Sequence, residues 1–223
     1  YKIKIRRNLR RGRPTRALQI LDQKRVQKVL DRVEIDDQRA RIAAGYFFAN
    51  KDKKALELAA AAADRSRKHV KLADWTAGLA AWRLGQYELS AHHFEQIAVA
   101  PRMSDWYRSA GAFWSARAHL TARQPAEVNR MLDIAATYPR TFYGLLARKM
   151  LGLPSTFSWA TPGLEQPALD ALAATPAGRR TLALLQVGED RRAERDMRGL
   201  AGRSTPEVAM GILALASRAN MPA

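Results

Sequence analysis

The chain has 223 residues, with 38 Lys or Arg against 21 Asp or Glu, which gives a formal net charge of +17. The absence of cysteine excludes a disulfide scaffold, a thiolate zinc site and a cysteine nucleophile. The charge excess predicts a polyanionic partner: nucleic acid, anionic lipid or an acidic envelope polymer. The longest apolar runs, 56–63 (which Glu57 interrupts) and 210–216, are well short of the roughly 18 residues of a membrane span, so we expect no transmembrane segment.

The first residues are the most basic part of the chain. No acidic residue occurs before Asp22, and the densest charge is at Arg6, Arg7, Arg10 and Arg11, which we predict as a contact for an anionic polymer. A solvated helix face at an exposed terminus explains the same run and is the simpler interpretation. In this basic stretch, Tyr1 is the only aromatic residue that could stack on single-stranded nucleic acid.

Most of the remaining chain shows the three- and four-residue apolar spacing of amphipathic helices, and β-branched residues never alternate over the length of a strand. Pro14, Pro125, Pro176 and Pro206 stand where helices are expected to begin, because proline at the first helical position loses no hydrogen bond. We predict an all-α chain with helices at 14–30, 35–49, 53–64, 72–84, 86–99, 104–122, 125–137, 141–151, 166–174, 177–187, 189–201 and 204–218.

The helices contain a degenerate repeat. A turn residue is followed five positions later by a small residue and four positions after that by a bulky one, in frames that start at Gly12, Asn50, Gly85, Arg123 and Gly188. A second set of regularly spaced residues lies inside the predicted helices that precede these turns. Its glycines are 33 residues apart, at Gly45, Gly78, Gly111 and Gly144. A period near 34 is typical of tetratricopeptide-like helical hairpins. An Ala-rich helical bundle without a true repeat is the alternative.

Segment 153–163, LPSTFSWATPG, has no helical period and is predicted to be a linker. It divides the chain into a superhelical domain, 1–152, and a smaller helical linker domain, 153–223. Four tryptophans in the first domain, Trp75, Trp82, Trp106 and Trp114, are on apolar stripes. We expect them to pack between hairpins rather than to form a sugar-stacking platform.

No catalytic, cofactor-binding or metal-binding residue is predicted. The sequence has no HExxH, EF-hand loop, phosphate-binding loop or GxSxG motif. His92 and His93 are adjacent, so on a helix their side chains point about 100° apart and cannot chelate one ion.

One segment is more specific. Residues 138–152, YPRTFYGLLARKMLG, resemble the junction motif of the soluble lytic transglycosylases of Gram-negative bacteria, a family in which this helix closes the superhelical region. The family motif places Thr141, Phe142, Tyr143 and Gly144 in this structural role. Segments 77–85 and 114–118 are similar to the family's repeats, and 188–200 is similar to its linker-domain helix, so the resemblance covers about residues 35–219.

The resemblance implies a function but no active site in this chain. Enzymes of the family cleave the MurNAc–GlcNAc β-1,4 bond of peptidoglycan to a 1,6-anhydro product, with one catalytic glutamate that precedes serine and a Gly-Leu-Met-Gln segment downstream. No glutamate here precedes serine, and Gly-Leu-Met-Gln is absent. We therefore expect a piece of a longer periplasmic enzyme: the scaffold that supports a missing catalytic domain and positions the glycan strand.

Two other functions stay open. A stand-alone tetratricopeptide-like adaptor would bind partner proteins, including cell-envelope proteins, in its groove. Nucleic-acid binding ranks third, because the sequence has no helix-turn-helix or RNA-binding signature.

Overall fold

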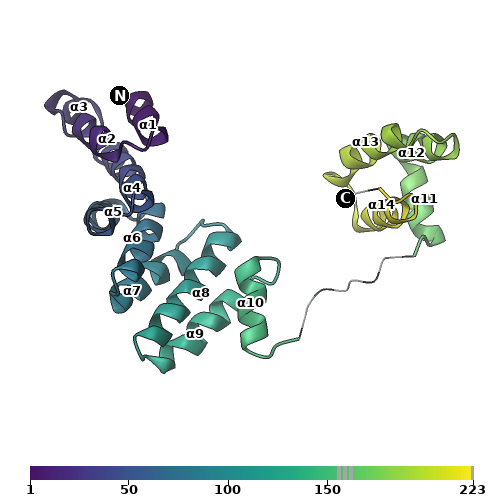
Figure 1. The fold of residues 1–223 in the computed structure, drawn as a ribbon. Helices are drawn as coiled ribbons and strands as arrows, with labels where there is room; N and C mark the ends of the chain where they lie inside the picture. The colour runs from purple at the N-terminus through teal and green to yellow at the C-terminus, as the bar shows by residue number, and fades with distance from the viewer. Residues whose placement is uncertain (155–156, 158–159, 161–162, 222–223) are drawn as a thin grey trace. The chain divides into compact units, whose positions relative to one another are not determined.

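The computed structural model describes residues 1–154, 157, 160 and 163–221 (Figure 1). Over these residues the chain forms fourteen α-helices and no strand, which confirms the predicted all-helical character. The chain divides into two compact units, Tyr1–Thr156 and Phe157–Ala223. The predicted linker, 153–163, lies largely outside the described residues.

The first unit is built from consecutive helices that pack on one another. Its helices are α1 (Lys2–Arg10), α2 (Pro14–Leu21), α3 (Lys24–Val29), α4 (Arg32–Phe48), α5 (Asp52–Ser66), α6 (Leu72–Arg83), α7 (Tyr87–Ala98), α8 (Asp105–Thr121), α9 (Pro125–Ala136) and α10 (Phe142–Met150). From α4 onward each helix packs against the next, and α4 also touches α6, as α8 touches α10. Aromatic pairs join α6 to α8, where the ring centroids of Trp75 and Tyr107 are 6.0 Å apart.

The turn residues of the repeat frame all adopt the left-handed conformation, which glycine and asparagine tolerate more readily than other residues. Their φ angles are 66° at Gly12, 57° at Asn50, 73° at Gly85, 59° at Arg123 and 74° at Gly188. The small and bulky residues that follow each turn are buried, apart from the partly buried Val128. Each turn therefore reverses the chain and returns one apolar face of the next helix to the core.

The regularly spaced glycines of the second set allow close packing of helices. A Cβ atom at Gly78 on α6 would lie 2.9 Å from the ring of Phe94, which is fully buried on α7. At Gly111 on α8 it would lie 2.8 Å from Ile97 and from the carbonyl oxygen of Phe94. Glycine inside a helix costs about 1 kcal/mol relative to alanine. Here that cost is offset by the burial of Phe94, which contributes about 2–3 kcal/mol.

The start of the chain differs from the prediction, which placed its first helix at 14–30. The structure adds α1, whose Ile5 is fully buried and whose Leu9 packs against the same core. These two residues have the i, i+4 spacing of an apolar helix face. This short apolar face was not recognised in the sequence, because the many positive charges around it give the segment a low average hydrophobicity.

The predicted helix 14–30 is wrong as a single element, because it breaks between Leu21 and Lys24 into α2 and α3. Gln23 has the extended backbone of a helix N-cap, with φ −62° and ψ 128°. On a continuous helix, Leu21 and Val26 would point roughly 140° apart. The break lets both reach the same core, where each is fully buried.

The second unit contains α11 (Gln166–Ala174), α12 (Pro176–Gln186), α13 (Asp190–Ala201) and α14 (Pro206–Arg218). Helix α12 packs on α13, and α11 packs on α12 and α14. Its core contains Leu172, Met197, Val208, Ile212 and Leu215. Proline occupies the first position of α2, α9, α12 and α14, as predicted.

Candidate binding groove and basic surfaces

The four arginines predicted to contact an anionic polymer lie at α1. Arg6, Arg7 and Arg10 are on the helix and Arg11 is its C-cap, and all four are exposed. None of them forms an ion pair within the described residues. They form a basic surface available to an anion, but they line none of the cavities described below.

Thr141 begins α10 with a side-chain cap. Its buried hydroxyl oxygen accepts a hydrogen bond from the backbone N–H of Gly144 at 3.0 Å. It also lies 2.9 Å from the carbonyl oxygen of Tyr138 and 2.8 Å from the hydroxyl of Ser109 on α8. The carbonyl of Tyr138 occupies the space beside Gly144, where a Cβ atom would lie 1.9 Å from the oxygen. Residue 144 must therefore be glycine while this turn keeps its shape.

The same arrangement recurs in the second unit, where it was not predicted from the sequence. Thr175 caps α12 through the backbone N–H of Gly178 at 3.0 Å, and its hydroxyl donates to the carbonyl oxygen of Leu172 at 2.9 Å. A Cβ atom at Gly178 would also lie 1.9 Å from that carbonyl oxygen. The sequence signal is a threonine with glycine three positions later. Because the same signal produces the same cap in both units, Thr141–Gly144 is a local structure that begins a helix.

The two aromatic residues of the junction motif have different surroundings. The hydroxyl oxygen of Tyr143 accepts a hydrogen bond from the indole N–H of Trp114 on α8 at 3.3 Å. Its ring lies 5.4 Å from that of Phe113, measured between centroids. Phe142 remains 54% exposed. Tyr143 thus attaches α10 to α8, whereas most of Phe142 faces solvent.

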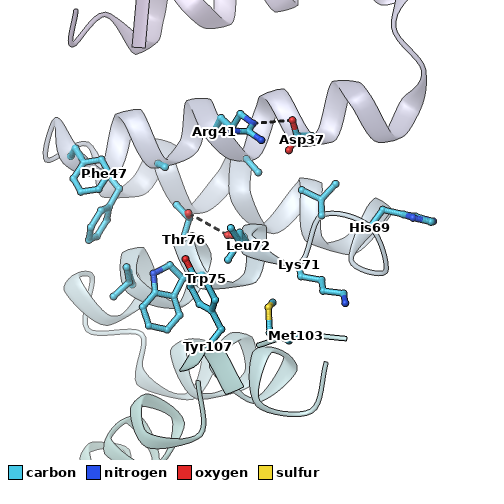
Figure 2. A pocket seen from close by; sticks show the side chains of 15 residues that line it. Asp37, Arg41, Phe47, His69, Lys71, Leu72, Trp75, Thr76, Met103 and Tyr107 are labelled. Carbon is cyan, nitrogen blue, oxygen red and sulfur yellow. Dashed lines mark hydrogen bonds and ion pairs between the residues drawn. The ribbon is translucent and has the colours of Figure 1, made fainter. Parts of the chain in front are cut away.

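An apolar groove of about 460 Å³ lies between α4, α6 and the start of α8 (Figure 2). Its walls include Phe47, Trp75, Met103 and Tyr107. Phe48, also in the lining, is 81% exposed. Aromatic and aliphatic walls of this kind are typical of sites that bind apolar groups.

Few polar groups of the groove are free to bind a ligand. Asp37 is paired with Arg41 at 2.9 Å, and the hydroxyl of Thr76 lies 3.5 Å from the carbonyl oxygen of Leu72 (Figure 2). The hydroxyl of Tyr107 and the indole N–H of Trp75 form no hydrogen bond within the described residues. His69 and Lys71 lie at one end of the lining, and the ammonium of Lys71 donates to the carbonyl oxygen of Pro101. The groove is therefore apolar along its length and cationic at one end.

This groove was not predicted from the sequence. Trp106 was expected to be a core residue, but it is 52% exposed, so that expectation is wrong, whereas Trp75, Trp82 and Trp114 are partly buried. A usable signal was the pair Phe47–Phe48, because adjacent residues on a helix cannot both face the core.

A second cavity, of about 930 Å³, is strongly basic. Six Lys or Arg side chains line it, with Asp64 as the one acidic residue in the lining. They come from the start of α4, the end of α5, the loop to α6 and the loop to α8: Arg32, Arg65, Arg67, Lys68, Lys71 and Arg102. Arg65 and Arg67 are held by the buried carboxylates Asp36 and Asp74. The other four cations form no ion pair within the described residues.

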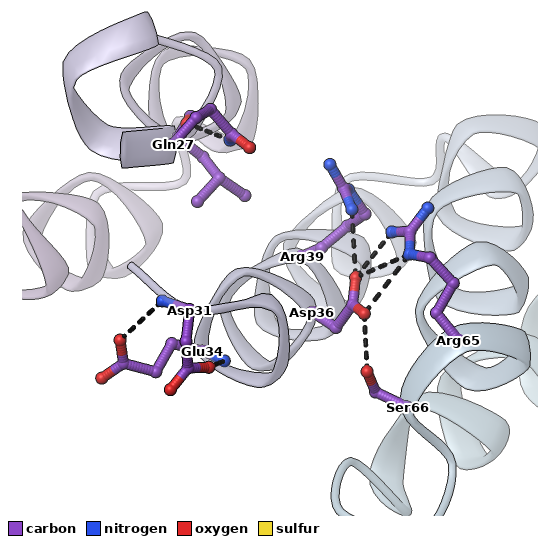
Figure 3. A network of polar contacts seen from close by, with 8 residues as sticks. Gln27, Asp31, Glu34, Asp36, Arg39, Arg65 and Ser66 are labelled. Carbon is purple, nitrogen blue, oxygen red and sulfur yellow. Dashed lines mark hydrogen bonds and ion pairs between the residues drawn. The ribbon is translucent and has the colours of Figure 1, made fainter. Parts of the chain in front are cut away.

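Asp36 is a fully buried carboxylate between α4 and α5 (Figure 3). It accepts hydrogen bonds from Arg65 at 2.6 Å, Arg39 at 3.1 Å and Ser66 at 2.7 Å. Burial raises the pKa of Asp36, but the hydrogen bonds from Arg65 and Ser66 and the nearby positive charges outweigh burial, so its pKa lies below the ordinary value. The network therefore stabilises the ionised carboxylate and fixes the guanidinium of Arg65 at the edge of the basic cavity.

This lowered pKa predicts that the first unit loses stability in acid. A carboxylate with a lowered folded-state pKa contributes its full stability above its unfolded pKa of about 3.9, and the contribution disappears as the pH falls through the folded value. Urea unfolding of the wild type and of Asp36→Asn should therefore differ most near neutral pH, and the difference should shrink below about pH 4. A difference that stays constant down to pH 2 would contradict this account.

A second buried network joins α6 to α7. The side chain of Asp74 accepts from Arg67 at 2.9 Å and from Nδ1 of His93 at 2.8 Å, and both Asp74 and His93 are almost fully buried. The other ring nitrogen of His93 has no partner within the described residues. The carboxylate thus holds Arg67 at the wall of the basic cavity, as Asp36 holds Arg65.

Across the described part of the chain, no three His, Asp or Glu side chains lie where they could share a metal ion. None of the helices described combines the length and apolar character that crossing a membrane requires. Comparisons with protein-family models, with curated proteins and with solved structures found no match to the chain.

Proposed function

We propose that this chain is the non-catalytic supporting region of a periplasmic lytic transglycosylase that acts on peptidoglycan. On this proposal the first unit is a superhelix of tetratricopeptide-like hairpins, and the second is a helical linker domain that leads to a catalytic domain. The observation that carries the proposal is the position of the Thr141–Gly144 motif. It begins α10, the final helix of the first unit, and fastens that helix to α8.

The repeat geometry supports the superhelical part of the proposal. Left-handed turns at Gly12, Asn50, Gly85 and Arg123 recur along the first unit, and each is followed by an apolar helix face. Close helix approaches at Gly78 and the other regularly spaced glycines are also typical of stacked hairpins. In such a stack each hairpin contacts mainly its neighbours, which produces an extended surface suited to supporting another domain.

Substrate positioning is the functional part of the proposal. The peptide stems of peptidoglycan carry free carboxylates, and the basic surfaces at α1 and at the α5–α6 loop would attract them. Exposed charges are screened by salt over about 10 Å at 0.1 M ionic strength. We therefore expect the purified chain to co-sediment with peptidoglycan sacculi at low salt and to be released at high salt.

Two controls separate the parts of this proposal. Arg6→Gln combined with Arg10→Gln should weaken co-sedimentation if α1 contributes, compared with the wild type at equal salt. No sedimentation at low ionic strength would refute substrate contact but not the supporting role. The supporting role is tested by the gene: a reading frame that continues beyond Ala223 into Glu-Ser and Gly-Leu-Met-Gln supports it, and an immediate stop codon contradicts it.

The apolar groove favours a second function, the stand-alone adaptor. A groove lined by exposed Phe48 and partly buried Trp75 is suited to binding a protein segment. The stop codon that would contradict the enzyme assignment would favour this adaptor function.

A further inference from the structure

The apolar groove and the basic cavity meet, because His69 and Lys71 line both. We propose that together they form one binding site for an acidic peptide segment of a partner protein. A bulky apolar side chain of the segment enters the groove, and neighbouring carboxylates lie over the basic cavity. The proposal does not depend on the lytic-transglycosylase assignment, because it uses only the side chains of the first unit.

The groove selects for an apolar side chain rather than a sugar. Sugar binding needs several hydrogen-bonding groups around an aromatic face. Here Asp37 is paired with Arg41 and Thr76 is bonded to the carbonyl oxygen of Leu72. The walls therefore offer a sugar little beyond the hydroxyl of Tyr107 and the indole N–H of Trp75. The surfaces left to a ligand are the rings of Phe47 and Trp75 and the thioether of Met103, seen together in Figure 2. A phenylalanine or leucine side chain buries its surface against such walls without needing polar partners.

The basic cavity selects for carboxylates. Basic residues near the end of α5 are ordinary, because the carboxyl end of a helix favours cations. Arg32 is different, since it occupies the first position of α4, and Lys71 is the N-cap of α6. At these amino ends a cation is opposed by the helix dipole, whereas an anionic ligand is favoured by both dipole and side chain.

Charge complementarity also decides between occupants. A second copy of this chain carries the same charge of +17, so electrostatic repulsion opposes its docking on a basic cavity. A bare polyanion satisfies the cations but leaves the groove and the exposed ring of Phe48 in water. A neutral apolar peptide fills the groove but leaves Lys68 and Arg102 without partners. An acidic segment with an apolar anchor satisfies both halves.

The test uses three fluorescein-labelled peptides in anisotropy titrations. The first has phenylalanines spaced among glutamates, the second replaces every glutamate by glutamine, and the third replaces every phenylalanine by serine. We expect the first peptide to bind most tightly. The dissociation constant of each altered peptide should be higher by a factor of about ten or more, because each altered peptide lacks one class of contact. Binding of the first peptide should also weaken with added salt.

Variants assign the binding to the site. Phe48→Ser with Leu72→Ser alters the groove, and both side chains are exposed, so folding should be retained. Lys68→Gln with Arg102→Gly removes two cations of the cavity, and Arg102 already has a φ of 56° that glycine adopts readily. We expect each pair to weaken binding about tenfold.

The matched control is Arg6→Gln with Arg7→Gln, which removes the same charge from exposed positions outside both cavities. It should change the affinity by less than about twofold, since screened charges outside the site act weakly. Equal losses in the control and in the Lys68/Arg102 pair would overturn the proposal in favour of diffuse electrostatic attraction. Equal binding of the serine peptide would remove the groove from the site. If soluble peptidoglycan strands bind in a manner sensitive to these variants and the first peptide does not bind, the occupant is the cell-wall polymer and the proposal is wrong.

Discussion

Replacing Gly144 by alanine is expected to lower the unfolding free energy of the first unit by about 3 kcal/mol. The added Cβ atom would lie 1.9 Å from the carbonyl oxygen of Tyr138, a distance that no backbone tolerates. That oxygen is held in place by the hydroxyl and the backbone N–H of Thr141. Relief of the clash requires opening the turn, which also loses the helix cap, a contribution of about 1 kcal/mol.

Gly199→Ala is the matched control for this prediction. Gly199 lies inside α13, is exposed, and has no atom within 4 Å of the position where a Cβ would be added. Alanine there should raise stability by about 0.5–1 kcal/mol through helix propensity alone. Chemical denaturation followed by circular dichroism measures both variants. If Gly144→Ala unfolds like the wild type, the cap geometry of α10 is wrong.

Thr141→Ala separates the two contributions at this turn. It removes the cap but introduces no clash, so we expect a loss of about 1 kcal/mol, clearly smaller than that of Gly144→Ala. A Cβ atom at Gly178 would lie as close to the carbonyl oxygen of Leu172 as one at Gly144 would to that of Tyr138. Gly178→Ala should therefore destabilise the second unit about as much as Gly144→Ala destabilises the first.

The helices of the first unit could largely be predicted from the sequence because their signals are local. The left-handed turn at Gly85 and the buried Phe94 nine positions later are encoded within one short segment. Pro125 at the first position of α9 is equally local. Arg123 shows the limit of such reasoning. It adopts a left-handed conformation that a bulky residue seldom takes, so the residue type itself does not predict this backbone conformation.

The parts that could not be predicted depend on contacts distant in sequence. Asp36 and Asp37 are the same residue type at adjacent positions, and only the first is buried, because Arg65 and Ser66 on the next helix bond to it. The groove likewise combines Phe48 with Tyr107, from different helices. Period and composition describe which face of a helix is apolar, but not which apolar faces remain uncovered after the helices pack.

The second large effect is expected at Asp36. Replacing it by alanine should lower stability by about 2–3 kcal/mol at neutral pH, at or just below the roughly 3–5 kcal/mol typical of a broken buried ion pair. The loss is limited because the side chain of Arg65 is 44% exposed, so water can solvate its guanidinium when the carboxylate is removed. Arg39 is only 18% exposed and the hydroxyl of Ser66 is buried. Without the carboxylate these two donors would lose a hydrogen-bond acceptor while largely shielded from water, which destabilises the folded state.

Asp37→Ala provides the control one residue further along α4. It makes the same change of charge and side chain, but Asp37 is 40% exposed and pairs with Arg41, which is 60% exposed. Exposed pairs of this spacing contribute about 0.3–0.5 kcal/mol, so the variant should unfold almost like the wild type. A double-mutant cycle between Asp36→Ala and Arg65→Ala should then yield a coupling energy above about 1 kcal/mol. Equal losses at Asp36 and Asp37 would mean that the buried network contributes no more than surface charge. In that case Arg65 would not be fixed at the basic cavity by its carboxylate.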